Sequence, residues 1–203
     1  MFHADSCKGL VFYLHGNAGN LTSWGYEAPL FTDIGYDVFM LDYRGYGKSG
    51  GKITSENQLF ADNQLAYNAM KSRYSEENMI ILGHSIGTGM AARIAATNQP
   101  KQLILQAPYY SLKALMKDKY PILPGFLLRY PFKTHEYLNK TSCPVTIIHG
   151  EDDHVIPIKH GEKLADSAPN QINLVALSQQ GHNGISNHPK YEKIIISLLS
   201  EIE

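Results

Sequence analysis

Apolar residues along the chain fall into short continuous runs, and longer stretches with helical periodicity separate these runs. This alternation is typical of βαβ units, in which buried parallel strands are apolar on both faces and helices cover the sheet. The predicted strands span 10–14, 37–41, 79–82, 102–105, 145–148 and 172–177. Helices are predicted after Ser55, after Ser85, across 159–167 and across 189–200. The sequence therefore predicts an α/β fold with a mostly parallel sheet and helices on both faces.

Two predicted helices carry local start signals, and one stretch breaks the alternation. Ser55 and Gln58 are spaced as in a capping box, in which the Ser side chain caps the helix and the Gln side chain returns to the Ser backbone. Pro189 suits a first helical turn, where its missing N–H is no loss. Between residues 108 and 143, Tyr, Pro and Leu replace the alternation. We expect one or two short helices there, forming a cap or lid insertion.

Length, composition and charge limit the classes of protein to which this chain can belong. Of the 203 residues, 43% are hydrophobic and 18% charged, so residues 1–203 are expected to form a single domain whose core needs neither disulfides nor a metal. The net charge of -1 and the lack of a Lys/Arg block argue against a nucleic-acid partner. Cys7 and Cys143 are too few for a disulfide framework and fit a cytoplasmic location. The sequence shows neither a signal peptide nor a run of ~18 apolar residues, so no transmembrane segment is predicted.

Residues 83–87 (GHSIG) have the Gly-x-Ser-x-Gly spacing of a serine nucleophile motif, but residues 47–51 (GKSGG) have the same spacing. Ser85 directly follows a predicted strand and precedes a predicted helix, whereas Ser49 lies in a Gly-rich loop. A strand-to-helix elbow strains the Ser backbone, projects the hydroxyl at the sheet edge and places it at a helix N-terminus that favours negative charge. We therefore predict Ser85 as the nucleophile. A phosphate-binding P-loop at Ser49 is rejected, because position 42 is Asp where that motif needs Gly.

A serine hydroxyl is a weak nucleophile near neutral pH, so it needs a base within hydrogen-bond reach and an acid that orients the base. With the nucleophile on such an elbow, the expected chain order is Ser, acid, His. The predicted strand 145–148 leads into three adjacent carboxylates, Glu151, Asp152 and Asp153, and the next strand leads to His182 on a loop after a Gly. We predict His182 as the base. The local sequence leaves the choice among the three acids open.

The chain has nine His residues, and seven of the eight besides His182 have simpler interpretations. His15 and His149 each precede a Gly at a strand end, where an imidazole usually bonds to local backbone. His154 lies beside the acids and is a candidate pocket residue. The rest are expected at the terminus, in the elbow or on the surface: His3, His84, His135, His160 and His188. No His pair has helical ligand spacing with a third ligand nearby, so neither a metal nor another cofactor is predicted.

Two backbone N–H groups are candidates for an oxyanion hole, which stabilises negative charge on the substrate oxygen. One belongs to Ile86, directly after the nucleophile, and the other to Asn17, in the Gly/Asn-rich loop 15–20. The alternative for Asn17 is an ordinary turn. Apolar residues of the insertion are candidates for an acyl pocket or, alternatively, for ordinary core contacts: Tyr109, Leu112, Leu115 and Met116, together with Tyr110, Tyr120, Phe126 and Leu127.

Four motifs follow one another along the chain: 14–20 (LHGNAGN), 42–49 (DYRGYGKS), 83–87 (GHSIG), and 150–157 (GEDDHVIP) followed by 181–183 (GHN). Together they resemble the small α/β-hydrolases of the serine aminopeptidase-like branch, which includes the mammalian abhydrolase-domain proteins. The resemblance covers nearly the whole chain and implies an α/β-hydrolase fold. In that family the acid stands three residues after the strand-end Gly, which implies Asp153 here. In that family, the loop corresponding to 42–49 is a structural loop near the active-site rim, which implies that Ser49 is not the nucleophile.

Relatives in this family usually carry an N-terminal β-hairpin, often after a membrane anchor, before the His-Gly-Asn strand. Here that strand is predicted to begin at position 10, so the N-terminal edge hairpin is expected to be missing. A missing hairpin leaves a sheet edge open to pairing with another chain. We expect a monomer or a weak homodimer.

These residues predict a serine hydrolase that cleaves a small-molecule acyl ester, as a carboxylesterase does, through an acyl-enzyme intermediate. His182 takes the proton from Ser85 during attack on the carbonyl, Asp153 fixes the imidazole, and water then releases the acid. A thioesterase or depalmitoylase and a serine peptidase fit the same triad. A non-catalytic binding module with the hydrolase fold is the alternative from another class. The presence of all three triad residue types in the expected order argues against that alternative, because a binding module has no need of them.

Overall fold

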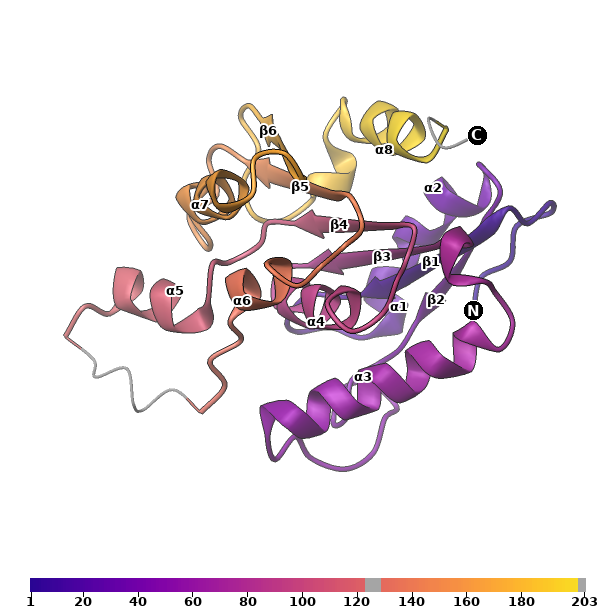
Figure 1. The fold of residues 1–203 in the computed structure, drawn as a ribbon, viewed down its shortest axis with the longest axis horizontal. Helices are drawn as coiled ribbons and strands as arrows, with labels where there is room; N and C mark the ends of the chain where they lie inside the picture. Colours follow the sequence, from indigo (N-terminus) through magenta and orange to yellow (C-terminus); the bar gives the residue numbers. More distant parts are fainter. Residues whose placement is uncertain (123–128, 201–203) are drawn as a thin grey trace.

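The computed structural model describes residues 1–122 and 129–200 of the chain. Its six-stranded sheet has the order β2-β1-β3-β4-β5-β6, and every neighbouring pair of strands is parallel (Figure 1). The strands are β1 (Gly9–Leu14), β2 (Tyr36–Met40), β3 (Met79–His84), β4 (Gln102–Gln106), β5 (Val145–Gly150) and β6 (Ile172–Leu177). Each predicted strand is confirmed, with ends that differ by no more than about two residues, as expected for boundaries read from sequence.

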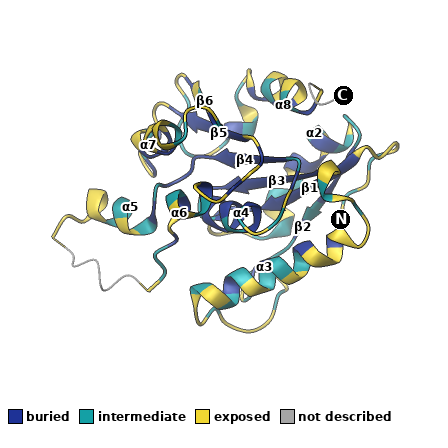
Figure 2. Cartoon of the chain, viewed as in Figure 1, coloured by how far each residue is buried: buried dark blue, intermediate teal, exposed yellow. Residues whose placement is uncertain are grey.

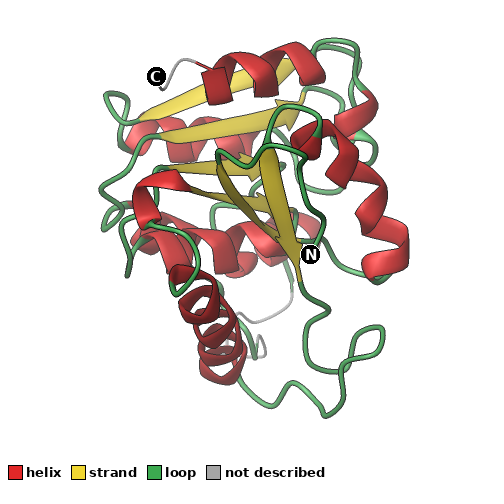
Figure 3. Ribbon diagram, turned by 90° about the vertical axis from the view of Figure 1, so that its right-hand side faces the viewer, coloured by secondary structure: helices red, strands yellow, loops and turns green. Residues whose placement is uncertain are grey.

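Helices cover both faces of the sheet, as predicted (Figure 3). The α-helices are α1 (Leu21–Trp24), α2 (Ala28–Thr32), α3 (Glu56–Lys71), α4 (Gly87–Ala95), α5 (Leu112–Lys119), α6 (Thr134–Leu138), α7 (Lys159–Ser167) and α8 (Tyr191–Ser200). Short 3-10 turns are η1 (Gly25–Glu27), η2 (Glu76–Asn78) and η4 (Ile185–Asn187). The helix predicted across 159–167 is confirmed in full. The one predicted across 189–200 begins at Tyr191, two residues later than expected.

The sheet is apolar on both faces, which explains why its strands are continuous apolar runs. In β1, alternate residues such as Phe12 belong to the core that includes side chains of α3, α4, α6 and α7. The residues between them, such as Tyr13, belong to the core formed with α2 and α8. Successive strand residues point to opposite faces, so one strand contributes to both cores. Every residue of β1, β3, β4 and β5 is buried, and these strands form the dark interior in Figure 2.

The β2 edge is not fully open. Phe2 forms an antiparallel bridge with Val38, and both of their backbone hydrogen bonds measure 2.9 Å. The Asp37 carboxylate accepts a further bond from the Ala4 N–H at 2.9 Å and lies 2.9 Å from His3 Nδ1. The first residues of the described chain therefore lie along the edge at which we expected no pairing partner.

Among its described residues, the predicted insertion at 108–143 contains the helices α5 and α6, which differ in burial. No residue of α5 is buried, and α5 lies beyond the carboxyl ends of the strands, at the left of Figure 1. In α6, Thr134 and Leu138 are buried, and Leu138 belongs to the core on the α4 side of the sheet. The Phe132 N–H donates to Glu56 Oε1 at 3.0 Å, which joins the segment before α6 to the start of α3. Of these two helices, α5 is therefore the one that lies outside the packed helix layer.

The predicted capping box of α3 is half confirmed. The Gln58 N–H donates to Ser55 Oγ at 3.0 Å, as expected. The Gln58 side chain, however, accepts from the Thr54 N–H at 2.8 Å and not from Ser55. The Thr54 hydroxyl donates to the same Gln58 oxygen at 2.9 Å. The Gln58 side chain therefore bonds the residue before the one expected.

Strand β3 ends in a buried imidazole, that of His84. Its Nδ1 lies 3.0 Å from Gln106 Oε1 on β4, and its ring centroid lies 5.1 Å from that of Trp24. Burial, together with the neighbouring His182, lowers the pKa of His84 to about 4, against the opposite effect of the Gln106 hydrogen bond. His84 is therefore neutral in the folded protein at neutral pH.

We expect His84 to make the fold sensitive to acid. The folded-state pKa of about 4 lies below the ordinary 6.5, so between these values the unfolded chain binds more protons than the folded one. The free energy of unfolding should fall as the pH is lowered through that range, by about 3 kcal/mol in total from this residue. In a His84→Gln variant, the urea midpoint should fall less steeply with pH than in the wild type.

The matched control is His154→Gln, which removes an exposed imidazole and should leave the slope unchanged. Burial also lowers the pKa of His15 and of His160, so some slope should persist in the His84→Gln variant. Equal slopes in wild type and His84→Gln would contradict the assignment.

Candidate active site

Ser85 lies in the turn between β3 and α4, at the carboxyl end of the strand. Its φ is 51°, in the left-handed region, and α4 begins two residues later at Gly87. A non-Gly residue in this region costs on the order of 1–3 kcal/mol and persists only where the surrounding structure enforces it. The strained strand-to-helix elbow predicted at Ser85 is therefore present.

Close packing leaves no room for a side chain at the two glycine positions of the elbow. A Cβ on Gly87 would lie 2.1 Å from the Leu14 carbonyl oxygen of β1. A Cβ on Gly83 would lie 2.7 Å from the Cβ of Ala91 on α4. Both distances are too short for any side chain, so strand and helix approach the elbow as closely as glycine permits. This approach holds Ser85 in its strained conformation.

The three predicted catalytic side chains lie together at the carboxyl ends of the strands. Ser85 follows β3, Asp153 follows β5 and His182 follows β6. His182 Nε2 lies 2.9 Å from Ser85 Oγ, and His182 Nδ1 lies 2.7 Å from Asp153 Oδ2. The His182 side chain is 10% exposed, and that of Asp153 is fully buried. The arrangement allows a proton to pass from the hydroxyl to the imidazole while the carboxylate orients the ring.

The Asp153 carboxylate is held on both oxygens. Oδ1 accepts from the N–H groups of Val155 and Ile156, each at 2.8 Å, and Oδ2 faces His182 and, at 3.4 Å, His149 Nε2. Burial by itself raises the pKa of this carboxyl. Hydrogen bonds from His149, His182 and Ile156 outweigh burial and hold the pKa well below its usual range. Asp153 is therefore ionised and fixed in direction.

The acid loop and the His loop are joined through their backbones. The Glu151 N–H donates to the Leu177 carbonyl, and the Asp152 N–H donates to the Gln180 carbonyl, both at 3.0 Å. Gly150 lies at this junction, where a Cβ would come within 2.2 Å of the Gln180 oxygen. Glu151 and Asp152 are exposed. Of the three neighbouring acids, the structure thus turns Asp153 toward His182.

The two predicted oxyanion donors border the same cavity. Asn17 and Ile86 both line the space next to Ser85 and His182. Within residues 1–122 and 129–200, neither backbone N–H makes a backbone hydrogen bond of its own. The Ile86 carbonyl is held by a hydrogen bond, which Tyr109 Oη donates at 3.1 Å. Asn17 and Ile86 therefore remain candidate oxyanion donors.

The cavity beside Ser85 has a volume of about 590 Å³. Three of the four main pocket candidates line it, namely Tyr109, Leu112 and Leu115, whereas Met116 is not among its lining residues. The same holds for Tyr110 and Tyr120, and Phe126 and Leu127 lie outside the described residues. The wall also contains residues that the sequence did not assign to it: Gly16, Trp24, Tyr43, Tyr46, Ile53, Leu59, His84, Met90, Tyr130, Phe132, Val155, Ile156 and Asn183.

Seven of these residues belong to the four motifs found in the sequence: Gly16, Tyr43, Tyr46, His84, Val155, Ile156 and Asn183. For the 42–49 motif, a place near the rim was implied by the resemblance. The remaining wall residues come from separate segments outside the motifs. His154, suggested as a pocket residue, is exposed and contributes its carbonyl to a bond with Lys119 Nζ.

The serine of the second Gly-x-Ser-x-Gly match, Ser49, makes hydrogen bonds within its own loop. Ser49 Oγ donates to the Asp42 carbonyl at 2.6 Å, and the Gly45 N–H donates to the Ser49 carbonyl at 3.2 Å. Ser49 is not among the residues of the cavity that holds Ser85. Its hydroxyl therefore supports a turn.

The other histidines mostly serve the structure. His15 Nδ1 lies 2.8 Å from the Gly16 carbonyl, and His149 Nε2 donates to the Ile156 carbonyl at 2.8 Å, as expected for imidazoles at strand ends. The surface position predicted for His160 is wrong, since it is 4% exposed. Its Nε2 lies 3.1 Å from Asp118 Oδ2, which joins α7 to α5. Sequence could not reveal this burial, because the covering residues are distant in the chain.

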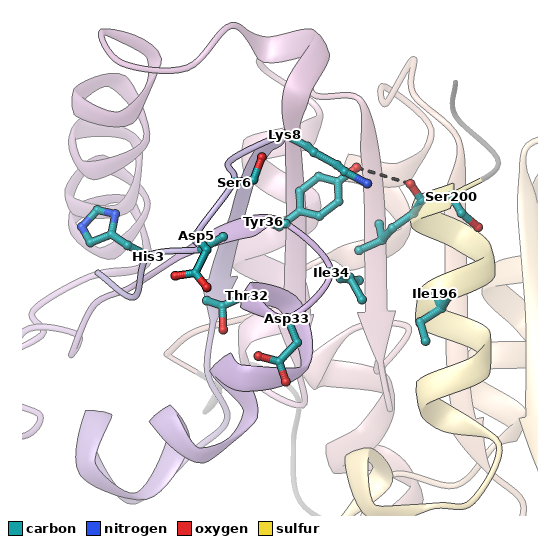
Figure 4. Close-up of a pocket in the computed structure, with 13 residues that line it drawn as sticks. His3, Asp5, Ser6, Lys8, Thr32, Asp33, Ile34, Tyr36, Ile196 and Ser200 are labelled. Atoms are coloured by element: carbon teal, nitrogen blue, oxygen red, sulfur yellow. Dashed lines mark hydrogen bonds between the residues drawn. The ribbon is translucent and has the colours of Figure 1, made fainter.

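A second cavity, of about 820 Å³, lies between the N-terminal segment, the end of α2 and α8 (Figure 4). Tyr36 and Ile34 line it from one side and Ile196 from the other, and Tyr36 Oη donates to the Leu199 carbonyl at 3.3 Å. None of the predicted site residues lines this cavity. It is therefore separate from the candidate active site.

In the described part of the chain, no group of three His, Cys, Asp or Glu side chains is placed to hold a metal ion. Over the same ranges, none of the helices is both long enough and apolar enough to cross a membrane.

Comparison with known proteins places the chain in a family. Residues 5–135 match the family described as "Serine aminopeptidase, S33". Lysophosphatidylserine lipase ABHD12 of Danio rerio is 34% identical over 192 residues, which cover 84% of this chain and 50% of that protein. Alpha/beta hydrolase domain-containing protein 17B of Homo sapiens is 31% identical over 201 residues, which cover 98% of this chain and 68% of that protein. The chain thus spans between 50% and 68% of the length of these two relatives.

Solved structures agree on the fold. Monoacylglycerol lipase from Paleococcus ferrophilus aligns with a TM-score of 0.76, over 100% of this chain and 97% of that one, at 17% identity. At that identity the likeness concerns the fold alone. The family match, the relatives and the parallel sheet with its elbow all agree, and the chain belongs to the serine aminopeptidase S33 family of the α/β-hydrolase superfamily.

Proposed function

We propose that the protein is a serine hydrolase that cleaves an uncharged acyl ester, with Ser85 as nucleophile, His182 as base and Asp153 as orienting acid. The relay of hydrogen bonds from Ser85 Oγ through His182 to Asp153, at 2.9 and 2.7 Å, carries this proposal. The relay opens into an apolar cavity, where a substrate carbonyl can reach the hydroxyl. Names of relatives, which include a lipase, support the same class of reaction.

The proposed reaction has two halves. Ser85 Oγ attacks the ester carbonyl carbon while His182 Nε2 takes the hydroxyl proton, and the carbonyl oxygen becomes an oxyanion held by the N–H groups of Asn17 and Ile86. His182 then gives that proton to the leaving alcohol, and an acyl-enzyme remains. Water repeats the sequence on the acyl-enzyme, releasing the acid and restoring Ser85. Asp153 stays ionised and stabilises the imidazolium in both halves.

The wall of the cavity favours an uncharged acyl group. Among its lining residues in the described chain there is no Asp, Glu, Lys or Arg, and His84 is neutral. Its volume of about 590 Å³ lies in the range of small-molecule sites. An aminopeptidase binds a free α-ammonium group, which needs an anionic or strongly polar partner when it is buried. The cavity offers no carboxylate for that purpose, so we favour an ester over an aminoacyl substrate despite the family's description.

Two alternatives remain from other substrate or functional classes. A thioesterase or depalmitoylase would use the same triad and the same acyl cavity, and would differ only in the leaving group. A non-catalytic binding module would bind an acyl ligand without turnover. A fluorophosphonate probe separates the last case, because only an activated Ser85 forms the covalent adduct.

We expect Ser85→Ala to lower kcat for p-nitrophenyl butyrate by up to ~10⁶ and to abolish fluorophosphonate labelling. Ser49→Ala is the matched control, because Ser49 has the same motif spacing but bonds within its own turn. This control should keep activity within about threefold of wild type. Wild-type hydrolysis by the Ser85→Ala variant would rule out the assignment.

Asp153→Asn should lower kcat by roughly 10⁴, because an amide at this position favours the wrong imidazole tautomer. Asp152→Asn removes a neighbouring carboxylate that is exposed, and should leave kcat within about threefold of wild type. Steady-state kinetics on the same ester measure both variants. The assignment of the acid fails if Asp152→Asn is the more damaging change.

The preference for an uncharged acyl group can be measured with one matched pair of substrates. A butyryl ester and its 2-aminobutyryl analogue with the same leaving group differ only in the ammonium group. We expect kcat/KM for the amino analogue to be about 10- to 100-fold lower, since the cavity would bury an unpaired charge. A preference for the amino analogue would instead support an aminopeptidase. A butyryl thioester of matched chain length tests the leaving group.

A further inference from the structure

The motif at 42–49 takes no part in the triad, yet its loop is fastened to the loop at 15–20 that carries Asn17. Tyr43 Oη donates to the His15 carbonyl at 2.7 Å. The Asp42 carboxylate accepts from the N–H at the start of α1 at 2.8 Å. The 42–49 loop therefore bonds the 15–20 loop at its first residue, His15, and at Leu21, the residue that directly follows it.

A third bond between the loops reaches Asn17 itself. Tyr46 Oη donates to Asn17 Oδ1 at 2.7 Å. The Tyr46 ring packs edge-on against Tyr43, with centroids 5.7 Å apart at 84°, and lies 5.9 Å from the His15 ring. Tyr46 is half-buried, whereas Asn17 is exposed. A ring held by aromatic packing thus presents its hydroxyl to a side chain that has little packing of its own.

Asn17 stands in a strained turn that needs such a bond. The next two residues, Ala18 and Gly19, have φ values of 64° and 73°, so two successive residues adopt the left-handed region. For Ala this conformation costs roughly 1–2 kcal/mol, so other conformations of the turn are close in free energy. Trp24 Nε1 donates to the Ala18 carbonyl at 3.1 Å and fixes the far side of the turn. Tyr46 fixes the side that faces the cavity.

We propose that Tyr46 is a positioning residue, whose hydroxyl holds Asn17 so that the Asn17 backbone N–H faces the developing oxyanion. This inference rests on the proposed function, because it concerns the rate of that reaction. An oxyanion donor is effective when it is already oriented before the reaction, since no reorganisation is then required. Loss of the Tyr46 hydroxyl frees the turn, which lowers kcat and leaves ground-state substrate binding nearly unchanged.

Tyr43 and Tyr46 should differ in what their hydroxyls do. Tyr43 is 2% exposed, and its partner, the His15 carbonyl, belongs to a fully buried residue. Tyr43→Phe removes the hydroxyl that bonds this buried carbonyl and should lower the melting temperature. Tyr46→Phe leaves the exposed Asn17 Oδ1 to bond with water instead, so the melting temperature should hold while kcat falls.

The chain offers a matched control in Tyr26. It does not line the cavity, it is exposed, and its hydroxyl lies 3.3 Å from Ser186 Oγ, away from the 15–20 loop. For p-nitrophenyl butyrate, we expect Tyr46→Phe to lower kcat about tenfold, less than the full loss of an oxyanion donor, with KM within about twofold of wild type. Tyr26→Phe should keep kcat within about twofold. An alkylboronic acid, which forms a tetrahedral adduct with Ser85, should bind Tyr46→Phe more weakly by the same factor as kcat.

A double-mutant cycle tests whether Tyr46 acts through Asn17. Asn17→Ala keeps the backbone N–H but removes the acceptor for the Tyr46 hydroxyl. In that background, Tyr46→Phe should change kcat by less than about twofold. Independent, multiplicative effects of the two substitutions would overturn the inference, as would equal kinetics for Tyr46→Phe and Tyr26→Phe. A folded wild-type protein that hydrolyses neither ester nor thioester would overturn the proposed function and this inference together.

Discussion

The backbone of Ser85, at a φ of 51°, is held by two contacts that no side chain could replace. Gly87 meets the carbonyl of Leu14 on β1, and Gly83 meets Ala91 on α4. These contacts join the centre of the sheet to the start of a helix at one point. The strain is thereby supported by the packing of β1, β3 and α4, all of which are buried. The hydroxyl is exposed to the cavity because the backbone beneath it cannot relax.

The partners of Ser85 depend on a second constraint, the pairing of β5 with β6. The loops after these adjacent strands are bonded to each other, and Gly150 permits their close approach. One loop then presents a carboxylate with both oxygens occupied, and the other presents His182 within reach of it. The site is therefore positioned by strand register, and its loops inherit the rigidity of the sheet.

The cavity combines strong local polarity with an uncharged wall. The ionised Asp153 is buried behind His182, and the nearby His84 is neutral because it is buried. An apolar wall strengthens the interaction of the two candidate N–H donors with a developing oxyanion, since little water competes there. The same wall disfavours a charged acyl group. The proposed reaction and the proposed substrate preference thus both rest on one arrangement, with the 42–49 loop as the proposed support for one of the candidate donors.

Sequence alone determined the strands, the elbow and the identity of Ser85 and His182 as candidates, because periodicity, glycine spacing and chain order are local or linear properties. It could not choose Asp153 from its neighbours by local chemistry, because adjacent loop residues differ only in direction. Tertiary structure decided that direction, excluded Met116 from the cavity wall, buried His160 against Asp118, and joined Tyr46 to Asn17. Each of these outcomes depends on which distant segments the sheet brings together, and no pattern within one segment encodes that.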